Sequence, residues 1–164
     1  IDVSHTFVNF EVKHFGTSTN RGRFDRKKGT VTFDRAAKTG SVDITIETRS
    51  VNTGFDPFTK ALISRDFLNS AEFPTARFTS DKFVFEGDKV SEVIGELTLM
   101  GQKQPITLKA MNFACYDNPM FKREVCGGDF EAYMERSKFG INWGLNLGFP
   151  DQVRLVIQVE AIRQ

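Results

Sequence analysis

Two cysteines, Cys115 and Cys126, are the most reactive side chains of this sequence, and the ten residues YDNPMFKREV separate them. A redox-active pair is typically Cys-x-x-Cys, and a zinc site needs two further ligands at a recognised spacing. Neither pattern is present, so we expect a disulfide that closes this loop between two strands. In the chain-entropy model the closure contributes about 3 kcal/mol. Two buried thiols remain the alternative reading, whereas a disulfide would indicate an oxidising compartment.

The two histidines, His5 and His14, are the next candidates for chemistry. Their spacing is odd, so on one unbroken strand their side chains point to opposite faces and cannot reach one metal ion. Adding the cysteines gives no recognised zinc spacing either, and we predict no metal site. His5 is expected to be structural, and His14 to lie beside a loop.

Motifs for catalysis are missing from the sequence. It has no Gly-x-Ser-x-Gly elbow, no His-Glu-x-x-His and no phosphate-binding loop. The many carboxylates alternate with apolar residues, which is typical of a solvated strand face. We therefore predict a protein that is not an enzyme and has no catalytic cofactor.

The composition is that of a globular domain with one unusual feature. Hydrophobic residues make up 40%, charged residues 26%, and the net charge is +1, which argues against a nucleic-acid partner. The length favours a single domain over residues 1–164, and no apolar run approaches the roughly 20 residues of a membrane span. Seventeen phenylalanines accompany one tryptophan and two tyrosines, so the interior is rich in large apolar rings.

Alternation of apolar and polar residues predicts strands along most of the chain. The alternating runs cover residues 6–14, 30–34, 41–47, 76–87, 95–101, 105–113, 129–136 and 152–162. Phe78 and Phe83 differ in parity within one run, which predicts a bulge. Glycine-containing turn sequences such as RKKG, AKTG and CGGD separate several of the runs.

One segment, DPFTKALISRDFLNS at residues 56–70, lacks alternation and predicts a short helix. Asp56 would cap it, Pro57 suits its first turn, and Phe58, Leu62 and Phe67 can share one face. Many meandering strands with one helical insert favour closure, because a barrel removes exposed sheet edges. The prediction is an all-β fold, an eight-stranded antiparallel barrel with a helical segment around residues 56–70.

Four stretches in order along the chain carry a family resemblance. They are IDVSHTFVNFEVKHFGTSTNRGRF at the N-terminus, ALISRDFLNSAEFPTARFTS in the middle, GELTLMGQKQPITL after it, and RSKFGINWG near the end. Together they resemble the YceI-like family, polyisoprenoid-binding periplasmic proteins with a lipocalin-like barrel. The sequence departs from the family where Thr59, Lys60, Ala61 and Leu62 replace Asp-x-His-Leu, and where Leu68 and Phe73 replace a Phe and a Tyr. These changes remove polar groups and keep the apolar ones.

The resemblance implies a long cavity that holds an isoprenoid lipid, either a polyprenyl compound or an isoprenoid quinone such as ubiquinone. It also implies a periplasmic or secreted protein. The sequence contains no signal peptide, and both a mature form and an excised domain are left open. The oligomeric state, including a homodimer, is left open.

The alternation indicates which side chains would line such a cavity, because residues of one parity face inward. From the strand runs we select Val8, Phe10, Phe33, Ile44, Ile46, Phe78, Leu97, Leu99, Leu108, Phe130, Met134, Leu155 and Ile157. Some of these must be packing only. Phe67 and Leu68 on the helical segment are candidate lids. The glycine-rich stretch KFGINWGLNLGFP adds Phe139 and Trp143 as either a cavity rim or a core cover.

A polar head group would need partners at the barrel mouth. His14, Asn20 and Arg21 lie beside the FGTSTNRGRF stretch and are the candidates, although a solvated loop is the competing interpretation. The alternative function is a carbohydrate-binding or other accessory module of a secreted protein. Sugars usually stack on exposed Trp or Tyr, of which this chain has three in total, while its many Phe residues lie on inward parity.

Overall fold

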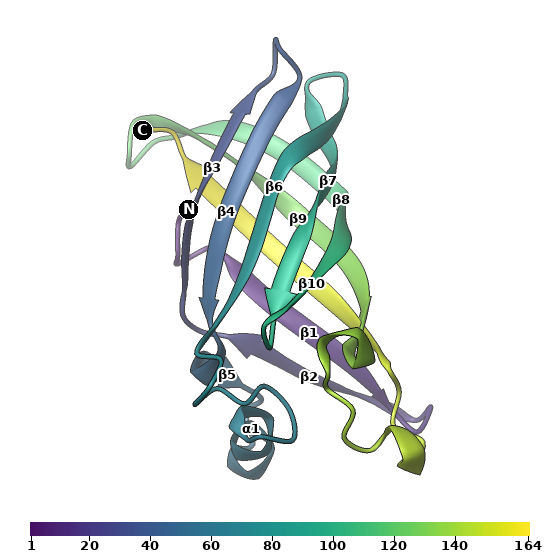
Figure 1. Cartoon of the computed structure of the whole chain (residues 1–164). Helices are drawn as coiled ribbons and strands as arrows, with labels where there is room; N and C mark the ends of the chain where they lie inside the picture. Colours follow the sequence, from purple (N-terminus) through teal and green to yellow (C-terminus); the bar gives the residue numbers. More distant parts are fainter.

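A curled antiparallel sheet forms most of the protein in the computed structural model, which describes residues 1–164. Its ten strands follow the order β3-β4-β6-β7-β8-β9-β10-β1-β2-β5 (Figure 1). The bounds are β1 Phe7–His14, β2 Ser18–Phe24, β3 Lys27–Asp34, β4 Thr39–Glu47, β5 Val51–Asn52, β6 Thr75–Glu86, β7 Lys89–Leu99, β8 Gln102–Asn118, β9 Arg123–Glu135 and β10 Gln152–Ile162. The predicted all-β, lipocalin-like barrel is therefore confirmed.

The strand count is ten instead of the expected eight. β5 has only two residues, and β2 escaped prediction because its inward positions carry little apolar signal. Register places Asn20, Gly22 and Phe24 of β2 opposite Val12, Phe10 and Val8 of β1. The Phe10 ring occupies the space that a side chain at Gly22 would fill, so β1 supplies the apolar group at this point for both strands.

β3 and β5 stand at the two ends of the strand order and are not paired with each other. Other contacts hold the seam beside β3. The N-terminal ammonium of Ile1 donates to the carbonyl oxygen of Gly29 at 3.1 Å, and Lys27 Nζ lies 3.9 Å from the Phe7 ring centroid. The N-terminal residues thus contact the edge strand β3, although no continuous ladder of backbone hydrogen bonds forms there.

The bulge predicted between Phe78 and Phe83 is confirmed. The pairing of β6 with β7 shifts register between Thr79 and Lys82. This shift lets both Phe78 and Phe83 face inward although their sequence parity differs.

Helix α1 is shorter than predicted, spanning Asp56–Ile63 instead of reaching residue 70. Phe55 is its N-cap, so Asp56 lies inside the first turn and is not the cap. After Ser64 the chain folds back, with Leu68 N–H donating to Leu62 O and Ser70 N–H donating to Ile63 O. Phe67 and Leu68 therefore sit in an irregular segment beyond the helix.

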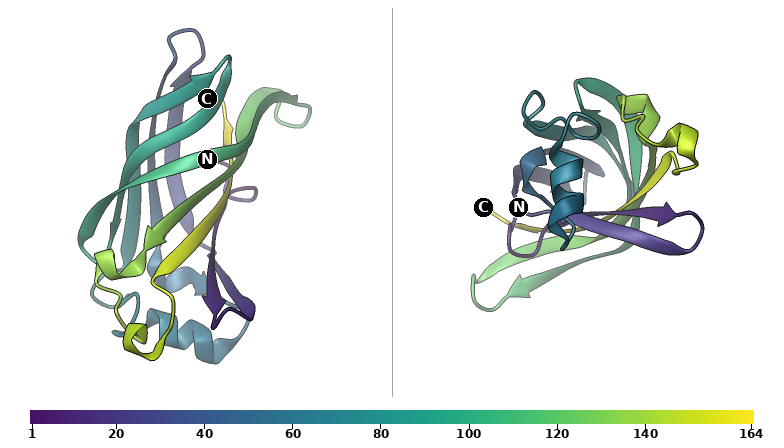
Figure 2. Two further views of the ribbon diagram at one scale, coloured as in Figure 1. Left: turned by 90° about the vertical axis from the view of Figure 1, so that its right-hand side faces the viewer. Right: turned by 90° about the horizontal axis from the view of Figure 1, so that it is seen from below.

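Three 3₁₀ helices, Thr48–Ser50, Arg136–Phe139 and Leu145–Leu147, complete the structure. Seen from below, α1 lies across one end of the curled sheet (Figure 2). The chain termini and the β8–β9 turn lie away from α1 (Figure 1). None of the helices has both the length and the apolar character needed to cross a bilayer.

The predicted disulfide is confirmed, but its setting differs from the expected loop. Cys115 and Cys126 are bonded and are direct cross-strand partners of β8 and β9. The two strands run on to Asn118 and from Arg123, so only residues 119–122 form the turn. The bond therefore encloses the expected ten residues, but most of them belong to two paired strands near the tip of a hairpin and not to a loop.

Candidate ligand-binding cavity

An apolar cavity of about 130 Å³ lies inside the curled sheet. It is lined by 22 residues, of which 20 are hydrophobic, and most of them come from strands. The lining comprises Thr6, Val8, Val31, Phe33, Val42, Ile44, Ile46, Phe78, Phe83, Val90, Val93, Leu97, Ile106, Leu108, Phe113, Cys126, Gly127, Phe130, Leu155, Ile157, Val159 and Ala161.

Strand register brings lining residues that are distant in sequence into continuous rows. Ile44 is opposite Phe78, and Phe78 is opposite Leu97, across three neighbouring strands. Val8 is opposite Ile157, which in turn is opposite Phe130. Because cross-strand partners project to the same face of a sheet, these rows form an uninterrupted apolar wall.

A glycine in the wall makes room for one of the large rings. The Phe83 ring lies against Gly40 of β4, where any Cβ would collide with it. The ring can therefore approach the neighbouring strand closely while it lines the cavity. Glycine at this strand position is explained by this close approach and not by a turn.

The cavity is closed at the end covered by α1. Leu68, Leu99, Phe139 and Ile141 are all buried in the core cluster there and do not line the open space. Leu99 is the last residue of β7, and Phe139 ends the 3₁₀ helix Arg136–Phe139. Packed side chains thus fill the α1 end of the barrel.

At the opposite end the apolar lining reaches the ends of the strands. Phe33 is one residue from the end of β3, Val90 is the second residue of β7, and Ala161 is one residue from the end of β10. The rings of Phe33 and Phe113 meet edge to face there, with centroids 5.8 Å apart. The cavity therefore approaches the surface at the end that carries the disulfide.

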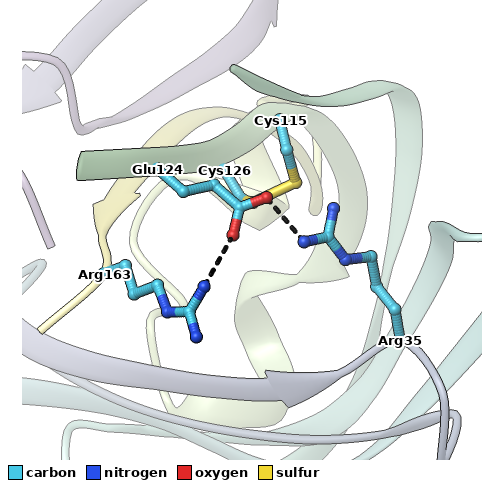
Figure 3. Close-up of a disulfide and its surroundings, with 5 residues drawn as sticks. All are labelled: Arg35, Cys115, Glu124, Cys126 and Arg163. Atoms are coloured by element: carbon cyan, nitrogen blue, oxygen red, sulfur yellow. Dashed lines mark hydrogen bonds and ion pairs between the residues drawn. A yellow bond between two sulfur atoms is a disulfide. The ribbon is translucent and has the colours of Figure 1, made fainter. Parts of the chain in front are cut away.

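Charged residues gather beside the disulfide (Figure 3). Arg35 Nη2 donates to Glu124 Oε1 at 2.5 Å, and Arg163 Nη1 lies 3.7 Å from Glu124 Oε2. Arg35 follows β3 and Glu124 lies on β9, two strands that are not neighbours in the sheet. The ion pairs thus connect separate parts of the sheet at the disulfide end.

Ten of the apolar residues selected from the sequence line the cavity: Val8, Phe33, Ile44, Ile46, Phe78, Leu97, Leu108, Phe130, Leu155 and Ile157. Seven lie elsewhere. Leu68, Leu99 and Phe139 are buried in the core at the closed end, and Met134 packs against that core. Phe10 covers Gly22 on β2.

Phe67 and Trp143 belong to an aromatic chain at the α1 end. Their ring centroids are 5.4 Å apart, Trp143 lies 5.4 Å from Phe149, and Phe149 lies 4.9 Å from Phe15. Trp143 remains 44% exposed. Phe67 and Trp143 therefore cover the closed end of the barrel and do not touch the open space.

The three residues selected for a head group are also not among the residues that line the cavity. His14 packs against Phe15 and Phe149 in the same aromatic chain. Arg21 donates to Glu11 at 3.0 Å on an exposed surface, and Asn20 sits opposite Val12 in the β1–β2 hairpin. The structure does not place these residues in the cavity lining, and their role toward a head group stays a prediction.

Several lining residues were not selected, although alternation would have found some of them. Val31, Val42, Ile106, Val159 and Ala161 share the parity of selected residues on their strands. Phe113, by contrast, follows a register shift in β8 between Ala110 and Asn112, which alternation alone does not reveal.

Two groups of potential metal ligands come together in the fold. Asp2, His5 and Glu160 form one, and Cys115, Glu124 and Cys126 form the other. In the first, His5 Nδ1 lies 2.8 Å from Asp2 Oδ2, and this hydrogen bond raises the pKa of His5. In the second, both sulfurs are held in the disulfide and cannot act as thiolate ligands.

Comparison with known proteins agrees with this architecture. Residues 1–161 match the sequence model of the YceI-like domain. Protein YceI of Salmonella arizonae is 37% identical over 161 residues, which cover 98% of this chain and 83% of that protein. Protein YceI of Salmonella heidelberg matches equally well.

Solved structures share the fold over nearly the whole chain. BcnA of Burkholderia cenocepacia superposes with a TM-score of 0.79 at 21% identity, covering 98% of this chain and 99% of that one. A polyisoprenoid binding domain from Saccharophagus degradans, implicated in plant cell wall breakdown, gives a TM-score of 0.68 at 16% identity, covering 97% and 94%.

Proposed function

The chain belongs to the YceI-like domain family, and from this membership we propose that it binds a long isoprenoid lipid, without catalysis, in its apolar cavity. The guest is a polyprenyl compound or the tail of an isoprenoid quinone such as ubiquinone. A fold-level relative described as a polyisoprenoid binding domain supports the proposal.

The apolar lining is the observation that carries this proposal. With 20 hydrophobic residues among 22, the wall offers dispersion contacts and very few hydrogen-bonding groups. Burying a hydrocarbon chain stabilises a complex by roughly 0.8 kcal/mol per methylene. Several isoprene units would therefore suffice for tight binding without polar contacts.

The open volume implies that the wall moves when a long guest enters. An apolar cavity of roughly 150 Å³ holds one benzene molecule, whereas the space here is about 130 Å³. A chain of several isoprene units is larger, so rings such as Phe33, Phe83 and Phe113 must swing aside. Aromatic rings turning about χ1 and χ2 can do this without breaking the sheet.

We also propose an oxidising location, periplasmic or secreted. The Cys115–Cys126 disulfide supports it, because such bonds persist where the thiol-reducing systems of the cytosol are absent.

Lipid extraction tests the proposed function directly. Protein purified without detergent should release an isoprenoid lipid into organic solvent, identified by mass spectrometry. The stripped protein should then take up a fluorescent polyprenyl probe. A protein that carries no lipid and binds no such probe would contradict the proposal.

A matched pair of substitutions locates the binding site. Val93 lines the cavity, whereas Val84, beside the Val93 partner Phe83, faces the other side of the sheet. Val93→Phe should reduce probe affinity at least tenfold by filling the cavity, and Val84→Phe should leave it unchanged. Equal effects of the two substitutions would place the guest elsewhere, and thermal denaturation checks that both variants fold.

A further inference from the structure

Three charged residues continue the cavity wall beyond its apolar part at the disulfide end. Arg35 comes two residues after Phe33, and Arg163 comes two residues after Ala161. Glu124 comes two residues before Cys126 on β9. Glu124 shares the strand face of Cys126, because residues two apart in an extended strand project to the same side. Arg35 lies in the turn after β3, with its guanidinium carbon 6.0 Å from the centroid of the Phe33 ring, and Arg163 follows β10 and approaches Glu124. The three groups therefore form a polar ring at the disulfide end of the cavity lining.

The two guanidinium groups converge on one carboxylate. Arg35 donates one hydrogen bond to Glu124, and Arg163 approaches its second oxygen without making any side-chain hydrogen bond (Figure 3). The backbone N–H of Arg163 donates to the carbonyl oxygen of Glu124 at 2.9 Å, which fixes the end of the chain beside β9. Each guanidinium has five N–H donors and no acceptor. Most N–H groups of Arg35 and Arg163 are therefore free to donate to a ligand with several acceptor oxygens.

We propose that Arg35 and Arg163 bind the phosphate or diphosphate head group of a prenyl phosphate whose chain lies in the cavity. The assignment rests on the proposed lipid-binding function and selects prenyl phosphates over quinones. The Glu124 carboxylate occupies the position between the two guanidinium groups that the phosphate takes. A phosphate displaces it because three acceptor oxygens and a larger charge suit paired arginines better than one carboxylate.

A second acid stands in the same ring. Asp117 is the cross-strand partner of Glu124, so the two side chains share one face of the β8–β9 hairpin. Asp117 is exposed and makes no ion pair with either arginine. Both acids oppose the binding of an anion, and removing either charge should therefore strengthen it.

The opposite end of the barrel is a poorer head-group site. The packed residues Leu68, Leu99 and Phe139 separate it from the cavity. Arg21 at that end is paired with Glu11 on the outer surface of β1 and β2. A head group there would be cut off from a chain lying in the cavity.

The test compares geranylgeranyl diphosphate with geranylgeraniol, which has the same chain and no phosphate. The wild-type protein should bind the diphosphate at least tenfold more tightly, as charged hydrogen bonds of ordinary strength predict. Arg35→Gln and Arg163→Gln should each remove most of this preference and leave the affinity for the alcohol unchanged, which also shows that they fold. Glu124→Gln and Asp117→Asn should increase the preference.

Arg77→Gln and Arg21→Gln are the controls. Arg77 pairs with Asp43 on the outer wall, and neither control should alter the preference. Equal affinity for the two lipids, or a preference lost in Arg21→Gln but not in Arg35→Gln, overturns the head-group site and leaves lipid binding intact. Inorganic diphosphate that binds as tightly as the lipid would show a site for free phosphates and also overturn it. Binding of neither lipid would refute both the site and the proposed function.

Discussion

Asp2 and His5 form a local hydrogen-bonded pair just before the first strand. The hydrogen bond from Ser4, followed by that from His5, lowers the pKa of Asp2 to about 2. The hydrogen bond to Asp2 raises the pKa of His5 above its ordinary 6.5. His5 thus has a structural role that its sequence position alone did not define.

The pair predicts a specific dependence on pH. Because the folded pKa of His5 is raised, its contribution to stability is complete below pH 6.5 and is lost as the pH rises through the folded pKa. The contribution of Asp2 is present above its ordinary pKa of 3.8 and is lost as the pH falls through about 2. Asp2→Asn should return the pKa of His5 toward 6.5.

An NMR titration of the His5 ring measures this shift, and the wild-type protein titrated in the same way is the reference. A His5 pKa that stays raised in Asp2→Asn would show that other groups cause it. Backbone amide shifts that change throughout the spectrum of Asp2→Asn would indicate a general change in the fold.

Arg136 holds the segment that covers the α1 end of the barrel. Its side chain is 6% exposed and donates to the carbonyl oxygens of Pro150 at 2.8 Å, Trp143 at 2.8 Å and Ile141 at 3.1 Å. Burial lowers the pKa of the guanidinium, but arginine stays charged in proteins. One buried cation therefore organises the chain from Gly140 to Pro150.

Arg136→Met should lower the free energy of unfolding by about 3 kcal/mol, because three carbonyl groups lose a charged donor. Arg136→Lys should recover little of the lost free energy of unfolding, since an ammonium group cannot reproduce the planar arrangement of donors in a guanidinium group. Chemical denaturation followed by the fluorescence of Trp143, the only tryptophan, reports on this segment. Arg77→Met on the exposed surface should cost less than about 1 kcal/mol, and a comparable loss in the two variants would contradict the role of Arg136.

The β8–β9 hairpin supplies a second prediction at this scale. Cys115→Ala with Cys126→Ala should destabilise the protein by about 2 to 3 kcal/mol, through the greater freedom of the unfolded chain. Wild-type protein under a strong reductant is the matched comparison, because it loses the bond and keeps both sulfurs. If neither treatment changes the denaturation midpoint, the hairpin is held by its ladder and the bond contributes nothing.

At the scale of the whole molecule, a bound lipid should stabilise the barrel. A ligand that binds only the folded protein at 100 times its Kd adds about 2.7 kcal/mol to the free energy of unfolding. For a protein of this size, that raises Tm by roughly 5 to 10 °C. Calorimetry of stripped and loaded protein measures the shift, which Val93→Phe should reduce to about half or less at the same lipid concentration. An unchanged Tm at saturating lipid would mean that the guest does not bind preferentially to the folded state.

The predictability of this structure varied from element to element for physical reasons. Strands with large apolar residues at inward positions, such as β4 and β10, were evident from alternation. β2 was not, because Phe10 of β1 fills the space above Gly22. The end of α1 was placed too late, since Phe58 and Leu62 have helical spacing and no strand alternation follows them before residue 70, although the chain turns back after Ser64.

The residues of the cavity were likewise only partly predictable from the sequence. Alternation identified the inward side of each strand, and ten selected residues do line the cavity. It could not tell the hollow part of the barrel from the packed part, because Leu97 and Leu99 have the same parity and only Leu97 meets the open space. That distinction depends on what α1 and the segment after it cover.

The sequence by itself determined the local properties: the alternating strands, the inward apolar set, the cysteine pair and the family. These depend on residues a few positions apart, where strand geometry leaves little freedom. Only the tertiary structure decided which end of the barrel is closed and which charges meet at the other. Arg35 and Glu124 are 89 residues apart, and their contact exists because pairing register and sheet curvature bring β3 and β9 to the same end of the cavity.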